Sequence, residues 1–413
     1  MKKTLAAVAV LGAFAGSAFA ADVTLYGRID AGLLYQHQDA DMGEAATDSW
    51  GLESGNMTGS RFGVKGSEQI TDDIKVSFTL ENGFKSDSGN FGTSSKFFDR
   101  EASLRVTTAY GEIGVGRMGR ILSDAGTYGQ RGQFILGSSW GGFTGGTEMI
   151  SDATSSRLDN MITYKSPEFA GVTVLAQYGM GDQGSENTSS TDRYYGIAAV
   201  GHWGALSGML GFEQTNYKSS FAKSAATFDT EELDDFIAGL GEGDIVDLSQ
   251  FKGHVYVDTP AKAARAEDQD DSIGIEASVA YDFGFVKTAM TARYFKDGND
   301  VNAINSEYED VLGRIDGYGV KLAAAAPVLG GTVQGMVGYM DAETAEATLE
   351  DDMDFKRYTV ALTYQYPLSK RTVLYTAASY TKDEYKDNVA GEGEQSKYEP
   401  TNTSFMFGMA HYF

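Results

Sequence analysis

The sequence predicts an all-β protein, a transmembrane antiparallel β-barrel of about sixteen strands. Two observations carry this prediction. Short segments in which apolar and polar residues alternate recur throughout residues 21–413, and their connectors alternate between short and long. Residues 283–284 form a short connector, whereas 38–57 and 118–156 are long ones. A barrel that stands in a bilayer has this layout, with tight turns at one rim and long loops at the other.

Residues 1–20 are expected to form a cleaved secretory signal peptide. Lys2 and Lys3 supply its positive start, residues 5–14 its apolar core, and Ala18-Phe19-Ala20 a small-x-small cleavage site. The alternative is an ordinary buried helix at the N-terminus. Removal of 20 residues leaves 393 of 413, predicted to form one barrel domain over 21–413, since no Pro-rich, Ser-rich or repetitive linker divides it.

The composition suits strands and tight turns. The chain has 51 Gly, 23 Phe and 23 Tyr but only 5 Pro, which favours aromatic-rich sheets over helix bundles. No segment after residue 20 approaches the roughly 18 unbroken apolar residues of a membrane helix. The chain has no cysteine, so the stability that disulfides often give exported proteins has to come from closure of the barrel.

The formal net charge is −25, and loss of Lys2 and Lys3 with the signal peptide would make it −27. Such a chain repels nucleic acid, so nucleic-acid binding is not expected. Many acidic residues fall in predicted loops, above all in 218–271, a long acidic extracellular loop with a short amphipathic helix expected near 230–240. These acids either keep the loops solvated or bridge divalent cations to lipopolysaccharide and solutes.

Residues 23–35 illustrate the alternation. Leu25, Ile29 and Leu33 share one face with their apolar neighbours, whereas Arg28 and Asp30 lie on the other. Tyr and Phe recur near segment ends, as expected for aromatic girdles at two membrane interfaces. The residues are Tyr26, Tyr35, Phe84, Tyr110, Tyr164, Phe169, Tyr281, Tyr366, Tyr380 and Tyr412. A soluble β-sandwich also alternates, but it does not predict connectors that alternate strictly in length.

Catalysis is not indicated. The four histidines, His37, His202, His254 and His411, are not at metal-ligand spacing, and no cysteine is present. We therefore expect no enzyme, no metal and no cofactor. A dyad of Ser or Asp residues brought together from distant loops stays open.

Arginines on the polar face are the candidate functional residues. Arg28, Arg61 and Arg157 lie on the first, second and sixth predicted strands, and Arg117 ends the fifth. Neighbouring strands would place them in one basic wall. The alternative is that each is solvated or pairs locally, as Arg28 would with Asp30.

Arg117 needs an irregular strand to join that wall. It shares parity with Ile113 and Val115, so it points inward only if Gly116 or Gly119 bends the strand.

An acidic partner for this wall is expected in the third long loop, 118–156. That loop carries Asp124, Glu148 and Asp152. If it folds into the lumen, opposed charges border a narrow aqueous gap, whose transverse field favours polar over apolar solutes.

Seven short motifs, taken in their order, resemble those of the general (non-specific) porins of Gram-negative outer membranes over nearly the whole mature chain. They are Val23-Thr24-Leu25-Tyr26-Gly27-Arg28, Ser60-Arg61-Phe62-Gly63-Val64-Lys65-Gly66, Leu80-Glu81-Asn82-Gly83-Phe84, Gly114-Val115-Gly116-Arg117, Asn160-Met161-Ile162-Thr163-Tyr164-Lys165-Ser166-Pro167, Tyr366-Pro367-Leu368-Ser369-Lys370-Arg371-Thr372 and His411-Tyr412-Phe413.

The resemblance implies a sixteen-stranded barrel in the outer membrane, a homotrimer, and an inward-folded third loop that forms the constriction. It implies passive diffusion of ions and small hydrophilic solutes. It also implies that Arg28, Arg61, Arg117 and Arg157 form the basic side of the constriction and that the barrel-insertion machinery reads Phe413. Instead of the Pro-Glu-Phe-Gly-Gly type motif of some relatives, this chain has Trp140-Gly141-Gly142-Phe143. Asp124, Glu148 and Asp152 are therefore candidates for the acidic side.

Two other functions stay open: a substrate-specific channel, suggested by the 218–271 loop, and a non-conducting surface or adhesion barrel. Ion preference is also open, because acidic loops attract cations whereas the arginines favour anions at the narrowest point.

Overall fold

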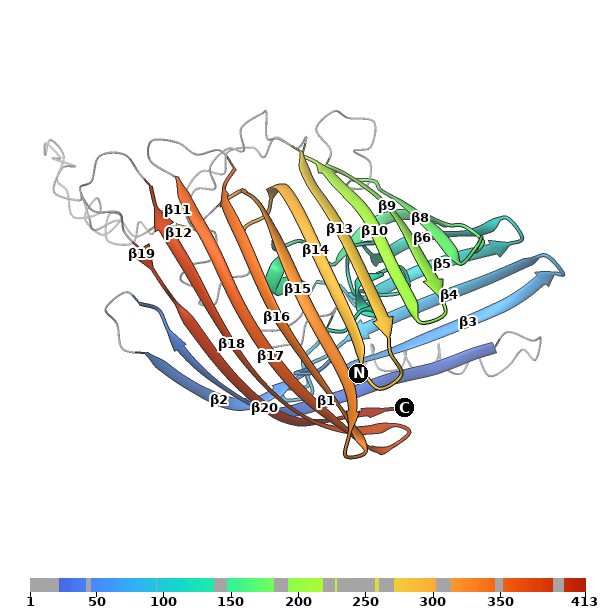
Figure 1. Ribbon diagram of the computed structural model, residues 1–413. Coiled ribbons are helices and arrows are strands. Elements are labelled where there is room, and N and C mark those ends of the chain that lie inside the picture. The colour runs from blue at the N-terminus through green and yellow to red at the C-terminus, as the bar shows by residue number, and fades with distance from the viewer. Residues whose placement is uncertain are drawn as a thin grey trace, which may run out of the picture.

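The computed structural model describes residues 22–41, 46–93, 95–136, 147–181, 192–217, 227–228, 257–259, 271–301, 313–345, 352–388 and 397–413. In Figure 1 the strands run obliquely and wrap into a barrel, which the pairing of β1 with β20 closes. The predicted signal peptide lies outside the described residues.

Sixteen strands of the described residues form the closed antiparallel barrel, as the sequence predicts. Each wall strand pairs with the next along the chain, and β1 pairs with both β3 and β20. The wall strands are β1 (Asp22–Asp39), β3 (Arg61–Thr71), β4 (Ile74–Gly83), β5 (Glu101–Thr108), β6 (Gly111–Gly119), β7 (Arg157–Lys165), β8 (Val172–Gly179), β9 (Arg193–Trp203), β10 (Leu206–Asn216), β13 (Ser272–Asp282), β14 (Lys287–Gly298), β15 (Ile315–Val328), β16 (Gly331–Thr344), β17 (Met353–Ser369), β18 (Thr372–Asp387) and β20 (Thr401–Tyr412).

The connectors alternate in length around the barrel. Tight turns such as 204–205 and 329–330 follow one end of the strands, and excursions such as 120–156 and 217–271 follow the other. Gly204 and Gly330 have φ values of 62° and 80°, the left-handed conformation that two-residue hairpin turns need and glycine adopts without strain.

The two faces of the wall differ as a membrane barrel requires. Leu25, Ile29 and Leu33 of β1 point outward and are 58%, 45% and 46% exposed, whereas the intervening Asp30 is fully buried. Other wall strands repeat this outward apolar pattern, as at Leu322 and Leu362. A sandwich would bury that face between two sheets, but a barrel turns it toward lipid. Within the described residues, no helix is long and apolar enough to cross a membrane.

Exposed aromatic side chains flank the tight turns. Tyr110, Phe169 and Phe285 are 85%, 84% and 74% exposed. Trp50, 80% exposed, lies toward the opposite rim on β2 (Thr47–Ser54). The girdle prediction fails for Tyr26, which faces inward and donates a hydrogen bond to Glu81 (3.0 Å).

Two predicted loop boundaries were wrong. The predicted loop 38–57 contains β2, which pairs with residues 31–38 of β1 and prolongs the wall beyond the barrel. Its acidic flank gives a loop-like composition, but the ladder satisfies the backbone. Pro367, expected in a turn, lies within β17, where the register shifts between Pro367 and Ser369. That irregularity accommodates the missing N–H of proline.

Five short elements complete the described structure. They are β11 (Thr227–Phe228) with β12 (Val257–Thr259), which pair in the 217–271 connector, β19 (Lys397–Tyr398), and two 3-10 helices, η1 (Arg131–Gln133) and η2 (Thr147–Ile150). The helix expected near 230–240 lies outside the described residues. η1 and η2 both belong to the connector between β6 and β7.

Candidate functional site

The structure brings the four predicted arginines together. Arg28 of β1 lies directly across from Arg61 of β3. The guanidinium of Arg61 is close enough to those of Arg28 and Arg157 to interact electrostatically, and Arg157 interacts in the same way with Arg117. Arg28 lies 5.5 Å from the centre of the Tyr412 ring. One basic cluster therefore spans both sides of the β1–β3 contact and reaches β7.

Arg100 is a fifth member that sequence reasoning missed. It interacts electrostatically with both Arg61 and Arg157, and its Nε donates to Glu81 Oε1 (2.8 Å). In a regular strand over residues 98–108, Arg100 would have the parity of the lipid-facing residues. In the structure β5 begins only at Glu101, the residue after Arg100. Before it, the Asp99 carboxylate accepts the N–H of Gly83 (2.7 Å). Such a bend leaves no signal in hydrophobic periodicity.

Arg117 depends on the irregularity expected for it. Gly116 has φ 125°, and the register between β6 and β7 shifts between Gly116 and Met118. Arg117 donates to the carbonyl of Asp99 from Nε and to Asp159 Oδ1 from Nη1, both at 2.6 Å. Lys96 also pairs with Asp159, so Asp159 is an acidic neighbour of the cluster that the sequence did not reveal.

Arg28 and Asp30 attract each other electrostatically but do not form an ion pair. The Asp30 carboxylate accepts hydrogen bonds from Tyr375 Oη (2.6 Å) and from the N–H groups of Met57 (3.0 Å) and Thr58 (2.7 Å). Asp30 thus ties the segment after β2 to the inner wall and leaves the Arg28 side chain in the basic cluster.

The three acidic candidates have different surroundings. Asp124 is exposed and interacts electrostatically with Arg157. Asp152 is buried, and its Oδ1 lies 2.8 Å from Nη2 of Arg293, so its partner is Arg293 rather than any of the four predicted arginines. Glu148 belongs to η2, but its side chain lies outside the described structure.

The connector between β6 and β7 contacts the polar, inner face of the wall. We call residues 120–136 its outgoing limb and 147–156 its returning limb. The outgoing limb begins beside β8, where Gln177 accepts the N–H of Ile121 (2.8 Å) and donates to the carbonyl of Gly119 (2.9 Å). It then reaches β15, whose Lys321 Nζ donates to the carbonyls of Ile135 (3.0 Å) and Leu136 (2.5 Å).

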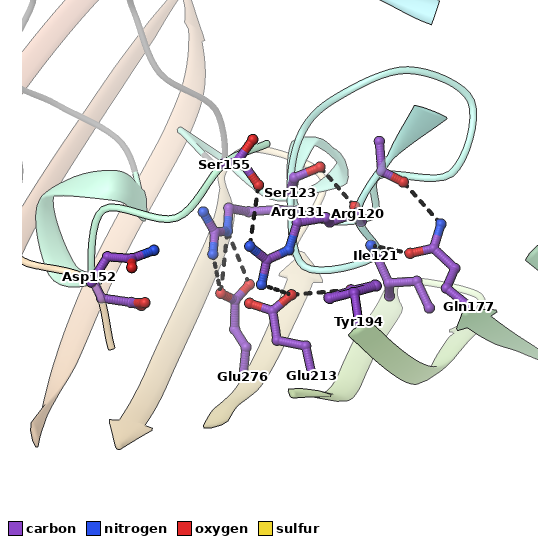
Figure 2. A network of polar contacts seen from close by, with 12 residues as sticks. Arg120, Ile121, Ser123, Arg131, Asp152, Ser155, Gln177, Tyr194, Glu213 and Glu276 are labelled. Atoms are coloured by element: carbon purple, nitrogen blue, oxygen red, sulfur yellow. Dashed lines mark hydrogen bonds and ion pairs between the residues drawn. The ribbon is translucent and has the colours of Figure 1, made fainter. Parts of the chain in front are cut away.

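A buried cluster of charges attaches both limbs to β10, β13 and β14. Figure 2 shows the part of it that joins the outgoing limb to Glu213 and Glu276. Arg120 pairs with Glu213 (3.1 Å) and Arg131 with Glu276 (2.7 Å). Burial disfavours the charged form of Arg120, but the carboxylate of Glu213 outweighs this effect and raises the pKa of Arg120. Each buried arginine of the connector thus has a carboxylate of the wall as its partner, and a buried charge needs such a partner to be stable.

Wall glycines lie where the two limbs press on the sheet. A Cβ on Gly319 of β15 would lie 2.0 Å from the carbonyl oxygen of Ile150, and one on Gly211 of β10 would lie 2.4 Å from Leu122 Cδ2. Gly298 similarly faces the Asp152 side chain. Only glycine permits so close an approach of the connector to these positions.

A closed barrel with a lipid-facing exterior and charged side chains on its inner wall defines a membrane channel protein. A family model described as Gram-negative porin matches residues 6–388, and the chain belongs to this family. Among the described residues, no group of three His, Cys, Asp or Glu side chains could hold a metal ion.

Named relatives agree with the family. The chain is 28% identical to an outer membrane porin protein of Bordetella pertussis, over 96% of this chain and 100% of that protein. It is 26% identical to outer membrane porin protein 32 of Delftia acidovorans, over 93% and 90%. The fold resembles a solved anion-selective porin from Comamonas acidovorans, with TM-score 0.62 and 22% identity, over 95% of this chain and 100% of that one.

Proposed function

We propose that this porin is a water-filled outer-membrane channel for passive diffusion of ions and small hydrophilic solutes, narrowed by the β6–β7 connector. The observation that carries the proposal is the cluster of Arg28, Arg61, Arg100, Arg117 and Arg157 on the inner wall of a closed barrel. Charged side chains around an aqueous passage stabilise ions and dipolar solutes. Apolar solutes gain no such stabilisation and are disfavoured.

The connector is assigned to the constriction because of what it touches. Its contacts run from Gln177 on β8 to Lys321 on β15, and β15 lies seven positions beyond β6 in the sixteen-strand order. A segment that reaches so far across the barrel narrows the passage. Asp124 is exposed and interacts electrostatically with Arg157. We therefore assign it to the acidic side of the constriction.

The passage is proposed to favour anions. Five guanidiniums gather in the cluster, whereas Glu81 is already shared between Arg61 (3.6 Å) and Arg100 (2.8 Å). A neighbour in fold is described as anion-selective. Charge in the outer connectors is screened within roughly 8–10 Å at physiological salt and weighs less than charge at the narrowest point.

The reversal potential of the purified porin in a salt gradient tests this preference. With the same salt at different concentrations on the two sides, we expect the sign of an anion-selective channel. A cation-selective sign would reject the assigned role of the arginines. A current that saturates and is blocked by one solute would instead favour a substrate-specific channel.

Export, assembly and surroundings belong to the same proposal. Residues 1–20 act as the cleaved signal peptide, and 21–413 form a barrel that assembles as a homotrimer and contacts lipopolysaccharide through its outer rim. The insertion machinery is proposed to read Phe413, whose backbone exchanges two hydrogen bonds with Gly27 of β1 (3.0 and 3.1 Å).

A further inference from the structure

Both limbs of the β6–β7 connector meet at one buried cation of the wall. Arg293 of β14 is 2% exposed. Its Nε and Nη2 lie 3.0 and 2.8 Å from Oδ1 of Asp152 on the returning limb. The same side chain lies 2.9 Å from Glu213 Oε1 and 3.7 Å from Glu276 Oε2.

Those two glutamates are the partners of the outgoing limb. Glu213 pairs with Arg120 (3.1 Å), and Glu276 pairs with Arg131 (2.7 Å). Arg293 is therefore connected to both limbs, directly through Asp152 and indirectly through the shared carboxylates. Figure 2 shows Glu276 and Glu213 projecting from the wall toward Arg131 and Arg120 of the connector.

The charges of this cluster balance. Three guanidiniums (Arg120, Arg131, Arg293) face three carboxylates (Asp152, Glu213, Glu276) within the contacts given above. Loss of Arg293 leaves two cations with three carboxylates in a buried place, where an uncompensated charge is strongly unfavourable. Glu213 and Glu276 are fixed on wall strands, whereas Asp152 belongs to the connector. The returning limb is therefore the part that we expect to move.

Other contacts of the returning limb do not replace this connection. The N–H of Ala153 donates to the carbonyl of Asp300 (2.7 Å), and Ile150 packs over Gly319. The carbonyls of Ser155 and Ser156 also accept hydrogen bonds from Arg120 of the outgoing limb (3.3 and 3.1 Å), but these join the two limbs to each other. A neutral hydrogen bond and an apolar contact with the wall constrain a segment less than a charge-assisted pair does.

We propose that Arg293 is the positioning residue that holds the β6–β7 connector against the wall and so keeps the passage open. This role rests on the proposed channel function. Without Arg293 the returning limb enters the passage and closes it in part, repeatedly and reversibly.

Single-channel recording on four variants tests the role. R293Q removes the cation. D152N removes the connector's carboxylate and leaves Arg293 with its two glutamates, which keeps a variant available if R293Q folds poorly. R293Q/D152N restores the charge balance without restoring the connection. R357Q/D383N removes a matched buried pair (2.6 Å) that joins two neighbouring wall strands, β17 and β18.

We expect R293Q and D152N to show partial closures several-fold more often than the wild type, at voltages where the wild type stays open. R293Q/D152N should regain the heat stability that R293Q loses but keep the closures. R357Q/D383N also removes one cation and one carboxylate together, so it should keep most of its heat stability, as R293Q/D152N does, but show no additional closures. This split separates positioning from general stability.

Two outcomes contradict the account in different ways. If wild-type protein conducts, and R293Q and D152N record like it, or R357Q/D383N closes as often as they do, Arg293 does not position the connector and the channel function stands. If folded wild-type protein does not conduct, the proposed channel function itself is overturned, and the role of Arg293 with it.

Discussion

At the scale of single residues, glycine and arginine have complementary roles in the inner wall. Gly211, Gly298 and Gly319 leave room for the connector to lie on the sheet, while the arginines either pair with carboxylates that hold it or face the passage. The same residue type therefore serves two purposes: Arg293 is buried among acids, whereas Arg28 lies in the cluster of cations.

Gly319→Ala tests the close approach of the connector. The added Cβ would lie 2.0 Å from the carbonyl oxygen of Ile150, so the connector has to shift, and such overpacking costs about 1–3 kcal/mol. Heat-induced unfolding in detergent measures the loss. Gly335→Ala on β16 is the matched control, because its Cβ would meet nothing closer than 3.5 Å. Equal heat stability of the two variants would argue against close packing of the connector on Gly319.

Arg61→Gln together with Arg157→Gln tests the basic cluster. A unit charge acts on an ion 4 Å away in water with about 1 kcal/mol, which alone is a factor of about five. Two charges are removed, and each affects anions and cations in opposite directions, so we expect the anion-to-cation permeability ratio to fall by more than about fivefold. Reversal potentials in a salt gradient give this ratio. Lys370→Gln, in the exposed turn between β17 and β18, removes a positive charge away from the cluster and should leave the ratio unchanged. An equal change in both variants would mean that net charge alone sets the preference.

At the scale of elements, β20 and β1 complete the barrel. They pair from Arg28–Tyr412 to Asp39–Thr401, and beyond the ladder Phe413 still exchanges two backbone hydrogen bonds with Gly27. The Phe413 ring lies over Gly27, where a Cβ would come within 2.4 Å of it. The last residue of the chain thus adjoins the start of the first strand.

Phe413→Ala is predicted to lower the yield of assembled barrel several-fold, because it removes both the ring over Gly27 and the proposed signal for insertion. The fraction that migrates as folded protein in unheated SDS gels, taken from outer membranes, measures this yield. Phe407→Ala removes an outward aromatic ring (57% exposed) from the same strand and should reduce the yield less. A yield as high for Phe413→Ala as for the wild type would reject the signal.

The strand pattern was readable from the sequence because lipid and water impose a period of two on every wall strand. The cluster of Arg28, Arg61 and Arg157 followed from that period. Arg100 did not, because a bend before β5 sets its direction. The partners of Asp152 did not either, since Arg293 lies 141 residues away along the chain. Long-range pairing inside a lumen depends on how a loop folds, and spacing does not encode it.

At the scale of the whole molecule, the barrel places apolar side chains outward and charged ones inward, so its exterior suits lipid and its interior water. The net charge of −25 concentrates in connectors, and the basic cluster lies on the inner wall. This separation is how an acidic protein would present the basic passage that we propose.

The homotrimer is tested by the mass of the protein–detergent complex, with detergent subtracted. We expect three times the mass of the mature chain, and closure of one reconstituted particle at high voltage in three equal steps. The mass of a single chain, with closure in one step, would contradict the trimer.

Planar-bilayer recording of the purified wild-type protein tests the central claim, a water-filled passage, most directly. We predict stepwise increases in current, each ohmic at low voltage and growing in proportion to salt concentration, since ions cross in water rather than through a saturable site. Folded protein that enters the bilayer without any such steps, or a current that saturates with salt at low concentration, would contradict the claim.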